Sequence, residues 1–201
     1  MKWRVVWSDN VEKIKIKKSH LKIAIIVVLV LVGAFFLFGV SQNKQGISST
    51  NVVDSPSAKP APDVSFTTIS GKGVKLSDYK GKKVMLWFFA TWCPTCQAGA
   101  QALEENNNQL GNLQILAVKT YKNAGYNGVS TKDFAQSNVP NSLEYDNWVW
   151  GNASQKATQI YNPKNYPDIY YLIDENGNVI NVNGAPGATI NSIISFANGR
   201  S

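Results

Sequence analysis

Histidine and cysteine are almost absent from this chain. Its 201 residues include one histidine, His20, and two cysteines, Cys93 and Cys96. With no histidine after residue 20, a Ser-His or Cys-His catalytic pair in the main part of the chain is excluded. A closed zinc site, which needs four ligands, is not expected, and we expect no metal. Two cysteines also cannot build the multi-bridge framework of a small secreted domain.

The chain has little net charge outside its N-terminal region. The formal net charge is +7, but residues 1–40 hold seven Lys and Arg against Asp9 and Glu12. Thirteen basic and eleven acidic residues remain in 41–201, so this part is close to neutral. We therefore expect no nucleic acid partner. The length suits one ordinary domain with additional segments.

One long apolar run stands out near the N-terminus. Residues 23–40 are eighteen uncharged, mainly apolar residues, and as a helix they would span about 27 Å, close to a bilayer core. Lysines are concentrated in residues 1–22, which predicts that this basic segment is cytoplasmic and that the chain after residue 40 lies outside. We expect a single-pass anchor in the cell membrane. A cleaved signal peptide is the alternative, although its apolar region is usually shorter.

The composition changes again after the apolar run. Residues 41–62 are rich in Ser, Asn, Pro and Gln, and they cannot bury enough apolar surface to offset the entropy of ordering. We interpret them as a flexible linker. Residues 63–201 then form the expected folded domain.

Strand and helix signals alternate in residues 63–201. The expected elements are a hairpin of strands 64–69 and 74–76, a buried strand at 84–90, a helix at 94–110, a buried strand at 113–118, helices at 131–137 and 155–161, a hairpin of strands 170–173 and 179–182, and a helix at 188–197. This order predicts an α/β fold in which a mixed central sheet has helices on both faces.

The two cysteines lie at the start of the helix predicted at 94–110. Residues three apart share a helix face, so Cys93 and Cys96 can approach closely enough to form a disulfide. The free N–H groups and positive dipole end of the helix favour a thiolate on Cys93, while Cys96 is placed to resolve a mixed disulfide. Pro94 suits the first helical turn. Half of a zinc site and a purely structural disulfide are the alternatives, but a four-residue loop gains little stability from a disulfide.

Two longer segments carry more information than the cysteine pair. They are PDVSFTTISGKGVKLSDYKGKKVMLWFFATWCPTC at 62–96 and YPDIYYLIDENGNVI at 166–180. Both resemble the thioredoxin superfamily, and within it the TlpA-like branch of membrane-anchored redoxins. The resemblance implies a thioredoxin-like fold, with Cys93 as attacking thiol, Cys96 as resolving thiol and Pro167 as a cis-proline facing the disulfide. It implies no cofactor other than the redox-active Cys93–Cys96 disulfide. The residues expected beside these are Trp92, Pro94, Thr95 and Tyr166.

The chain departs from thioredoxins at the residue six positions before the first cysteine. Trp87 stands there, where thioredoxins proper have a buried Asp, so another group must exchange a proton with Cys96. Asp168 follows Pro167, at a position where some reducing members of the branch carry an acidic residue, and we regard it as a catalytic candidate. The alternative is that Asp168 is a solvated turn residue.

Residues 119–165 match the family only loosely, and substrate specificity is a candidate role for them. The nearby aromatic residues are expected to pack in the core or at half-buried positions, with a partner-binding patch as the alternative. These residues are Trp148, Trp150, Tyr161 and Tyr166.

The function that the sequence predicts is an extracytoplasmic thiol-disulfide oxidoreductase. Its partners would be protein thiols and disulfides, with a membrane electron donor as a further candidate. Asp168 favours a reductant, of the cytochrome c maturation or repair type, because negative charge disfavours a thiolate. A disulfide-forming oxidase of secreted proteins and a non-catalytic tethered binding module are the alternatives. A thiol peroxidase would need a Thr where Ala90 stands.

Overall fold

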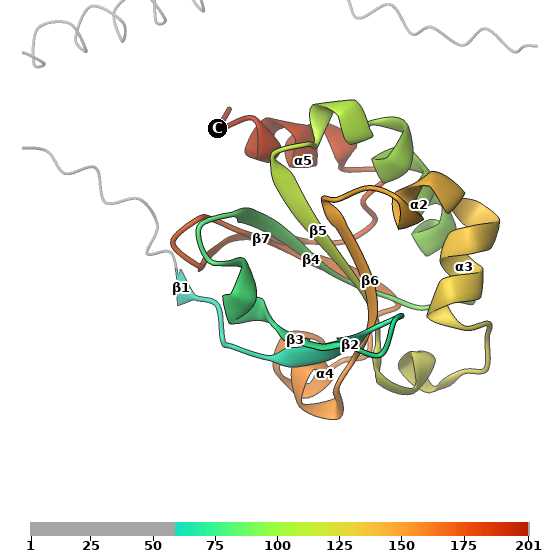
Figure 1. Cartoon of the computed structure of the whole chain (residues 1–201). Coiled ribbons are helices and arrows are strands. Elements are labelled where there is room, and N and C mark those ends of the chain that lie inside the picture. The colour runs from blue at the N-terminus through green and yellow to red at the C-terminus, as the bar shows by residue number, and fades with distance from the viewer. Residues whose placement is uncertain (1–58, 201) are drawn as a thin grey trace, which may run out of the picture. The chain divides into compact units, whose positions relative to one another are not determined.

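One mixed sheet organises the part of the chain that this computed structural model describes, residues 59–200. Its eight strands have the order β1-β8-β7-β4-β5-β6-β2-β3 (Figure 1). The strands are β1 (Lys59–Pro60), β2 (Ser65–Thr68), β3 (Gly73–Lys75), β4 (Lys83–Phe89), β5 (Leu113–Lys119), β6 (Trp148–Ala153), β7 (Asp168–Ile173) and β8 (Asn178–Asn183). β4, β5 and β6 are parallel, and the other pairs are antiparallel.

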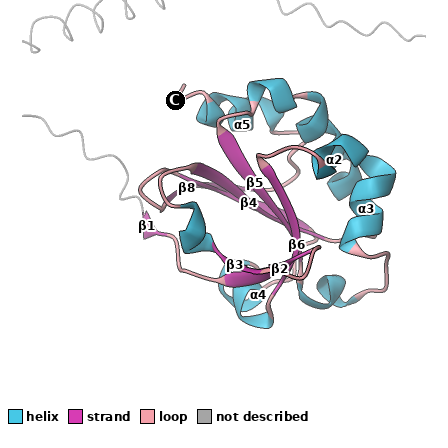
Figure 2. Ribbon diagram, viewed as in Figure 1, coloured by secondary structure: helices cyan, strands magenta, loops and turns pink. Residues whose placement is uncertain are grey.

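Helices cover both faces of this sheet, as predicted (Figure 2). The α-helices are α2 (Pro94–Glu105), α3 (Thr131–Asn138), α4 (Gln155–Tyr161) and α5 (Ile190–Ala197). Short 3-10 helices are η1 (Leu76–Tyr79), η2 (Asn107–Gln109), η3 (Tyr121–Gly125) and η4 (Pro140–Leu143). The apolar side chains of α2, α3 and α5 pack in one core cluster, and those of α4 pack in the other.

The central strand β4 joins the two core clusters. Successive side chains of a strand point to opposite faces, so Met85, Trp87 and Phe89 pack under α2 and α3. Leu86 and Phe88 point to the α4 side. All five side chains are at most 1% exposed. The uninterrupted apolar run of β4 therefore fits a strand covered on both faces.

The sheet begins earlier in the chain than the sequence suggested. Lys59 of β1 pairs with Val179 of β8, and the Ala61 N–H donates to the Gly177 carbonyl at 2.9 Å. The end of the predicted linker is thus part of the folded domain. The predicted basic segment, the predicted anchor at 23–40 and most of the predicted linker lie outside the described residues. Within residues 59–200 no helix combines the length and apolar character needed to span a bilayer.

Helix α2 is shorter than the helix predicted at 94–110. It ends at Glu105, and the Asn106 side chain donates to the Ala102 carbonyl at 2.8 Å. Short Asn side chains compete with the helical backbone for hydrogen bonds. The run of asparagines that follows Glu105 therefore ends the α-helix, and η2 takes its place.

Strand β6 was not predicted, because Gly151 and Asn152 interrupt a strand pattern with residues that strands disfavour. The absence of a side chain at Gly151 is needed, since a Cβ there would lie 2.7 Å from the Thr67 carbonyl oxygen of β2. Core packing is confirmed for Trp148 and Trp150 of β6, and also for Tyr161 of α4. Tyr166 instead has 48% of its surface exposed.

Candidate active site

Cys93 is the N-cap residue of α2. Its backbone is extended, with φ −89° and ψ 118°, and its Sγ accepts a hydrogen bond from the Cys96 N–H at 3.3 Å. The Thr95 hydroxyl lies 3.1 Å from the same sulfur. Free N–H groups at a helix N-terminus stabilise negative charge. The sulfur of Cys93 therefore lies at the N-terminus of α2, and Pro94 occupies the first turn. The role of attacking thiol stays a prediction.

Cys96 lies one turn further into α2 and is fully buried. Both cysteines are free thiols in this structure, and the Cys96 thiol donates to the Pro167 carbonyl at 2.8 Å. Burial raises the pKa of Cys96, and the negative charge of Asp168 raises it further. Cys96 therefore holds its proton near neutral pH and needs an acceptor for that proton before it can attack.

Asp168 begins β7 and brings a carboxyl group to both thiols. Its Oδ1 accepts a hydrogen bond from the Trp87 indole at 2.8 Å, while its Oδ2 has no hydrogen-bond partner among residues 59–200. Burial raises the pKa of Asp168, and the Trp87 indole and the Thr95 hydroxyl act against this shift. The position is a partly buried strand end rather than a solvated turn. Trp87 occupies the position where thioredoxins have a buried Asp. Its indole thus orients the carboxyl group of Asp168, which comes from another strand.

The three titratable groups form one cluster. The sulfur atoms of Cys93 and Cys96 and a carboxylate oxygen of Asp168 all lie within 4.8 Å of one another. This is also the only group of three or more His, Cys, Asp and Glu side chains within residues 59–200 close enough to share a metal ion. It supplies three donors, one fewer than a structural zinc site.

Pro167 lies beside the thiols as predicted, but the peptide bond before it is trans. No peptide bond in residues 59–200 is cis, so the prediction of a cis bond is wrong. Asn162 binds both backbone groups of Tyr166: its Oδ1 accepts the N–H at 2.8 Å and its Nδ2 donates to the carbonyl at 2.8 Å. These contacts fix the N–H and the carbonyl of Tyr166, and trans is the intrinsically favoured form of an X-Pro bond.

Asn123, in η3, is a site residue that the sequence analysis missed. Its Oδ1 accepts a hydrogen bond from the Thr91 N–H at 2.9 Å, and its carbonyl accepts one from the Trp92 indole at 2.9 Å. Lys122, Asn123 and Ala124 all have positive φ, between 50° and 57°, which costs on the order of 1 kcal/mol per residue. Asparagine tolerates such angles, but a single Asn gives no signal for them in the sequence.

An exposed aromatic pair lies next to the cysteines. Trp92, which precedes Cys93, is 38% exposed, and Tyr126 is 66% exposed. Their ring centroids are 4.8 Å apart in an edge-to-face arrangement. Large exposed rings beside a reactive group are suited to contact with another protein.

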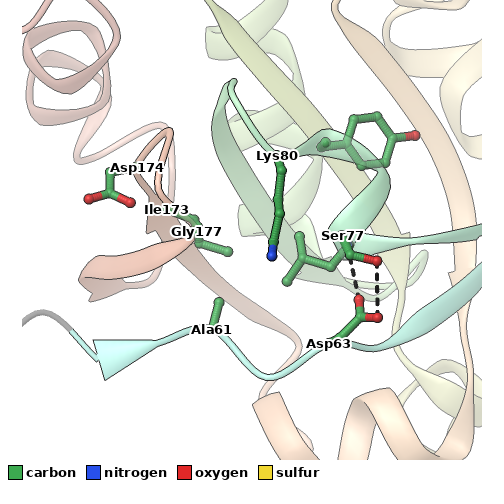
Figure 3. A pocket seen from close by; sticks show the side chains of 9 residues that line it. Ala61, Asp63, Ser77, Lys80, Ile173, Asp174 and Gly177 are labelled. Atoms are coloured by element: carbon green, nitrogen blue, oxygen red, sulfur yellow. Dashed lines mark hydrogen bonds between the residues drawn. The ribbon is translucent and has the colours of Figure 1, made fainter.

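A cavity of about 220 Å³ lies elsewhere, between η1 and the turn that joins β7 to β8 (Figure 3). Lys80 and Asp174 line it, together with Asp63, whose carboxylate accepts hydrogen bonds from the N–H and the hydroxyl of Ser77 at 2.9 and 3.0 Å. None of the residues of the cysteine site lines this cavity.

Comparison with solved structures identifies the fold. A thioredoxin-like protein from Aeropyrum pernix matches with a TM-score of 0.52 and 22% identity, over 65% of this chain and 87% of that one. The fold of residues 59–200 is therefore thioredoxin-like. The sequence profile of the AhpC/TSA family matches residues 58–182, more than half of the chain, and the protein belongs to this family.

The chain is similar in sequence to curated proteins whose names describe thiol-disulfide chemistry or a thioredoxin-like protein. Thioredoxin-like protein YneN of Bacillus subtilis (strain 168) is 31% identical over 118 residues, which are 58% of this chain and 65% of that protein. Thiol-disulfide oxidoreductase ResA of Bacillus thuringiensis subsp. konkukian (strain 97-27) is 37% identical over 83 residues, which are 40% of this chain and 44% of that protein. The chain spans less than two thirds of the length of these relatives.

Proposed function

We propose that this protein is a thiol-disulfide oxidoreductase that reduces disulfide bonds of other proteins. The observation that carries the proposal is the cluster at the start of α2, where Cys93 caps the helix and Cys96 is buried beside Asp168. The name of the relative ResA supports the same chemistry. The proposed reaction uses the cysteine pair itself and requires no other cofactor.

The reaction proceeds in two exchanges. The Cys93 thiolate attacks one sulfur of a substrate disulfide, which forms a mixed disulfide and releases the other substrate sulfur as a thiolate. Cys96 then transfers its proton to Asp168 and attacks the Cys93 sulfur, which releases the second substrate thiolate. The protein is left with a Cys93–Cys96 disulfide, and the two electrons have passed to the substrate. A protein dithiol must then reduce Cys93–Cys96 for the next cycle.

The surroundings of the thiols favour the reducing direction. Asp168 lies within 4.8 Å of both sulfurs. A negative charge beside a thiol pair destabilises the dithiol form relative to the disulfide. When the disulfide form of such a protein is harder to reduce, its dithiol form is the stronger reductant. The second candidate function is an oxidase of secreted proteins. Such an oxidase would need surroundings that stabilise the dithiol form relative to the disulfide.

The location that we propose is the outer side of a membrane. Residues 23–40 would anchor the chain and residues 1–22 would remain in the cytoplasm, because the lysines are concentrated before the apolar run. The substrates would then be extracytoplasmic proteins, and a membrane protein could supply the electrons. To test this, Lys72→Cys in a Cys93→Ser, Cys96→Ser background should react with a membrane-impermeant maleimide in intact cells. Reaction only after lysis would contradict the proposed topology.

Insulin reduction by dithiothreitol tests the activity. The wild-type protein should accelerate insulin precipitation, and Cys93→Ser should abolish the acceleration. Cys96→Ser should accumulate mixed disulfides with protein substrates, since the resolving thiol is lost. A wild-type protein that does not accelerate precipitation would favour the remaining alternative, a binding module without redox activity.

A further inference from the structure

The segment after β5 has an unusual backbone conformation. Four consecutive residues have positive φ: Lys122 at 50°, Asn123 at 53°, Ala124 at 57° and Gly125 at 93°. Residues other than glycine avoid this region because their Cβ crowds the backbone. A run of three such residues persists only where the surrounding contacts hold it in place.

These contacts converge on Asn123, which is 7% exposed. Its N–H donates to the Thr120 carbonyl at 2.8 Å, which closes the turn. Its Oδ1 accepts from both the N–H and the hydroxyl of Thr91, at 2.9 and 3.3 Å. Its carbonyl accepts from the Trp92 indole at 2.9 Å. Asn123 therefore binds the two residues that immediately precede Cys93.

Gly128 lies against the contact between Asn123 and Thr91. A Cβ at this position would lie 2.3 Å from the Thr91 hydroxyl oxygen and 2.5 Å from Asn123 Nδ2. Neither distance is compatible with a side chain unless Thr91 or Asn123 moves. The turn and Gly128 thus enclose Thr91 between them.

Thr91 lies two residues before Cys93, so its position constrains how the chain approaches the Cys93 sulfur. Only Trp92 separates the two residues, and the Cys93 N–H is held by the Ala90 carbonyl at 3.2 Å. A displaced Thr91–Trp92 segment would carry Cys93 away from the Cys96 N–H, now 3.3 Å from its sulfur, and from the Thr95 hydroxyl. Both groups are hydrogen-bond partners available to a thiolate.

We propose that Asn123 is a positioning residue for the nucleophile, which through its bonds to Thr91 and Trp92 holds the Cys93 sulfur against the donors at the start of α2. The inference rests on the proposed function for its biological meaning. It concerns the reactivity of Cys93 alone, however, and can be tested without any protein substrate.

The test is the rate at which iodoacetamide alkylates Cys93 at pH 6 in the full-length protein in detergent, in a Cys96→Ser background. Asn123→Ala removes the amide and adds to the strain, whereas Asn123→Gly removes the amide but relieves the strain. Both should slow alkylation about three- to tenfold, the range expected for one lost hydrogen bond. Gly128→Ala should slow it as well, since it displaces Thr91 while the Asn123 amide remains.

Asn147→Ala is the matched control. Its side chain donates to Asn107 Oδ1 and to the Leu110 carbonyl at 3.0 and 3.2 Å, just before β6 begins, at the end of the parallel strands opposite to Cys93. This variant should lose stability to urea and retain the wild-type alkylation rate.

The proposal is wrong if Asn123→Gly and Gly128→Ala are folded and react at the wild-type rate. A wild-type protein that fails to reduce insulin would instead contradict the proposed function, while slowed alkylation in the Asn123 variants would still stand.

Discussion

Within residues 59–200, Asp168 is the acidic residue that forms a cluster with the two thiols. Asp168→Asn keeps an acceptor for the Trp87 indole and removes the negative charge. The dithiol form should then become more favourable, and the reduction potential should become less negative by about 15 to 30 mV, because about 30 mV corresponds to 1.4 kcal/mol for two electrons. Equilibration with glutathione measures this shift.

The same variant distinguishes two roles of Asp168, the effect of its charge on the reduction potential and the acceptance of the Cys96 proton. If Asp168 accepts the Cys96 proton, Asp168→Asn should also slow the resolution of a mixed disulfide at Cys93, which stopped-flow measurements can follow. Thr95→Ser, which keeps both the carboxyl and the hydroxyl that lies against the Cys93 sulfur, serves as a comparison and should leave both quantities unchanged. If Asp168→Asn changes neither the reduction potential nor the rate of mixed-disulfide resolution, the role of Asp168 is structural only.

Asp168 also makes stability depend on pH. Burial raises its pKa above the ordinary 3.8, so the folded protein binds this proton more tightly than the unfolded chain does. The stabilisation from that proton is fully present below pH 3.8 and is lost as the pH rises through the folded-state pKa. Asp168→Asn should therefore be more stable than the wild type at pH 7. Urea unfolding should show the two stabilities converging in acid, and an advantage that is independent of pH would contradict this account.

At the scale of residues, the sequence predicted what a local pattern can encode. Cys93 and Cys96 were predicted because their spacing matches one helical turn. Asp168 was a candidate because it follows Pro167, at a position where the family that the sequence resembles can carry an acidic residue. The bond between Trp87 and Asp168 joins residues 81 positions apart, and nothing local encodes it. The role of Asn123 depends in the same way on a contact across 32 positions.

At the scale of elements, the contact between β2 and β6 leaves no room for a side chain at Gly151. A Cβ at Gly151 would lie 2.7 Å from the Thr67 carbonyl oxygen, a backbone atom that cannot rotate away. Gly151→Ala should therefore destabilise the protein by about 1 to 3 kcal/mol, as overpacking generally does. Urea unfolding measures the loss. Gly111→Ala, where a new Cβ meets nothing within 4 Å, should stay within about 0.5 kcal/mol of the wild type.

Elements were predictable where one signal dominated. β4 and β5 are continuous apolar runs, and the hairpin of β7 and β8 surrounds a strong turn sequence that ends in Gly177. The structure confirms all three. β6 lacked such a signal because Gly151 and Asn152 interrupt the strand pattern that begins at Trp148. Pairing with β5 and β2 on either side imposes the strand conformation on these two residues. Tertiary contacts override local propensity in such a case.

At the scale of the whole molecule, β1 places folded residues before the predicted boundary at residue 63. A chain that begins at Lys59 keeps the pairing with β8, whereas a chain that begins at Asp63 loses it. The shorter chain also loses the bond from the Tyr161 hydroxyl to the Pro62 carbonyl, at 2.6 Å. Both chains should fold, with the shorter one less stable by about 1 to 3 kcal/mol, a range set by two or three lost hydrogen bonds. Equal urea midpoints would mean that β1 contributes nothing.

The bonds from Asn162 to Tyr166 have a consequence for how this protein can change over evolution. One side chain fixes both backbone groups of the residue before Pro167, so the exposed residues between them, 163–165, do not determine where Pro167 lies. Insertions and substitutions in this short loop should therefore be tolerated, while Asn162 itself should not be replaceable. Variation in loop length among homologous chains would then alter the surface that meets a substrate without disturbing the geometry of the cysteines.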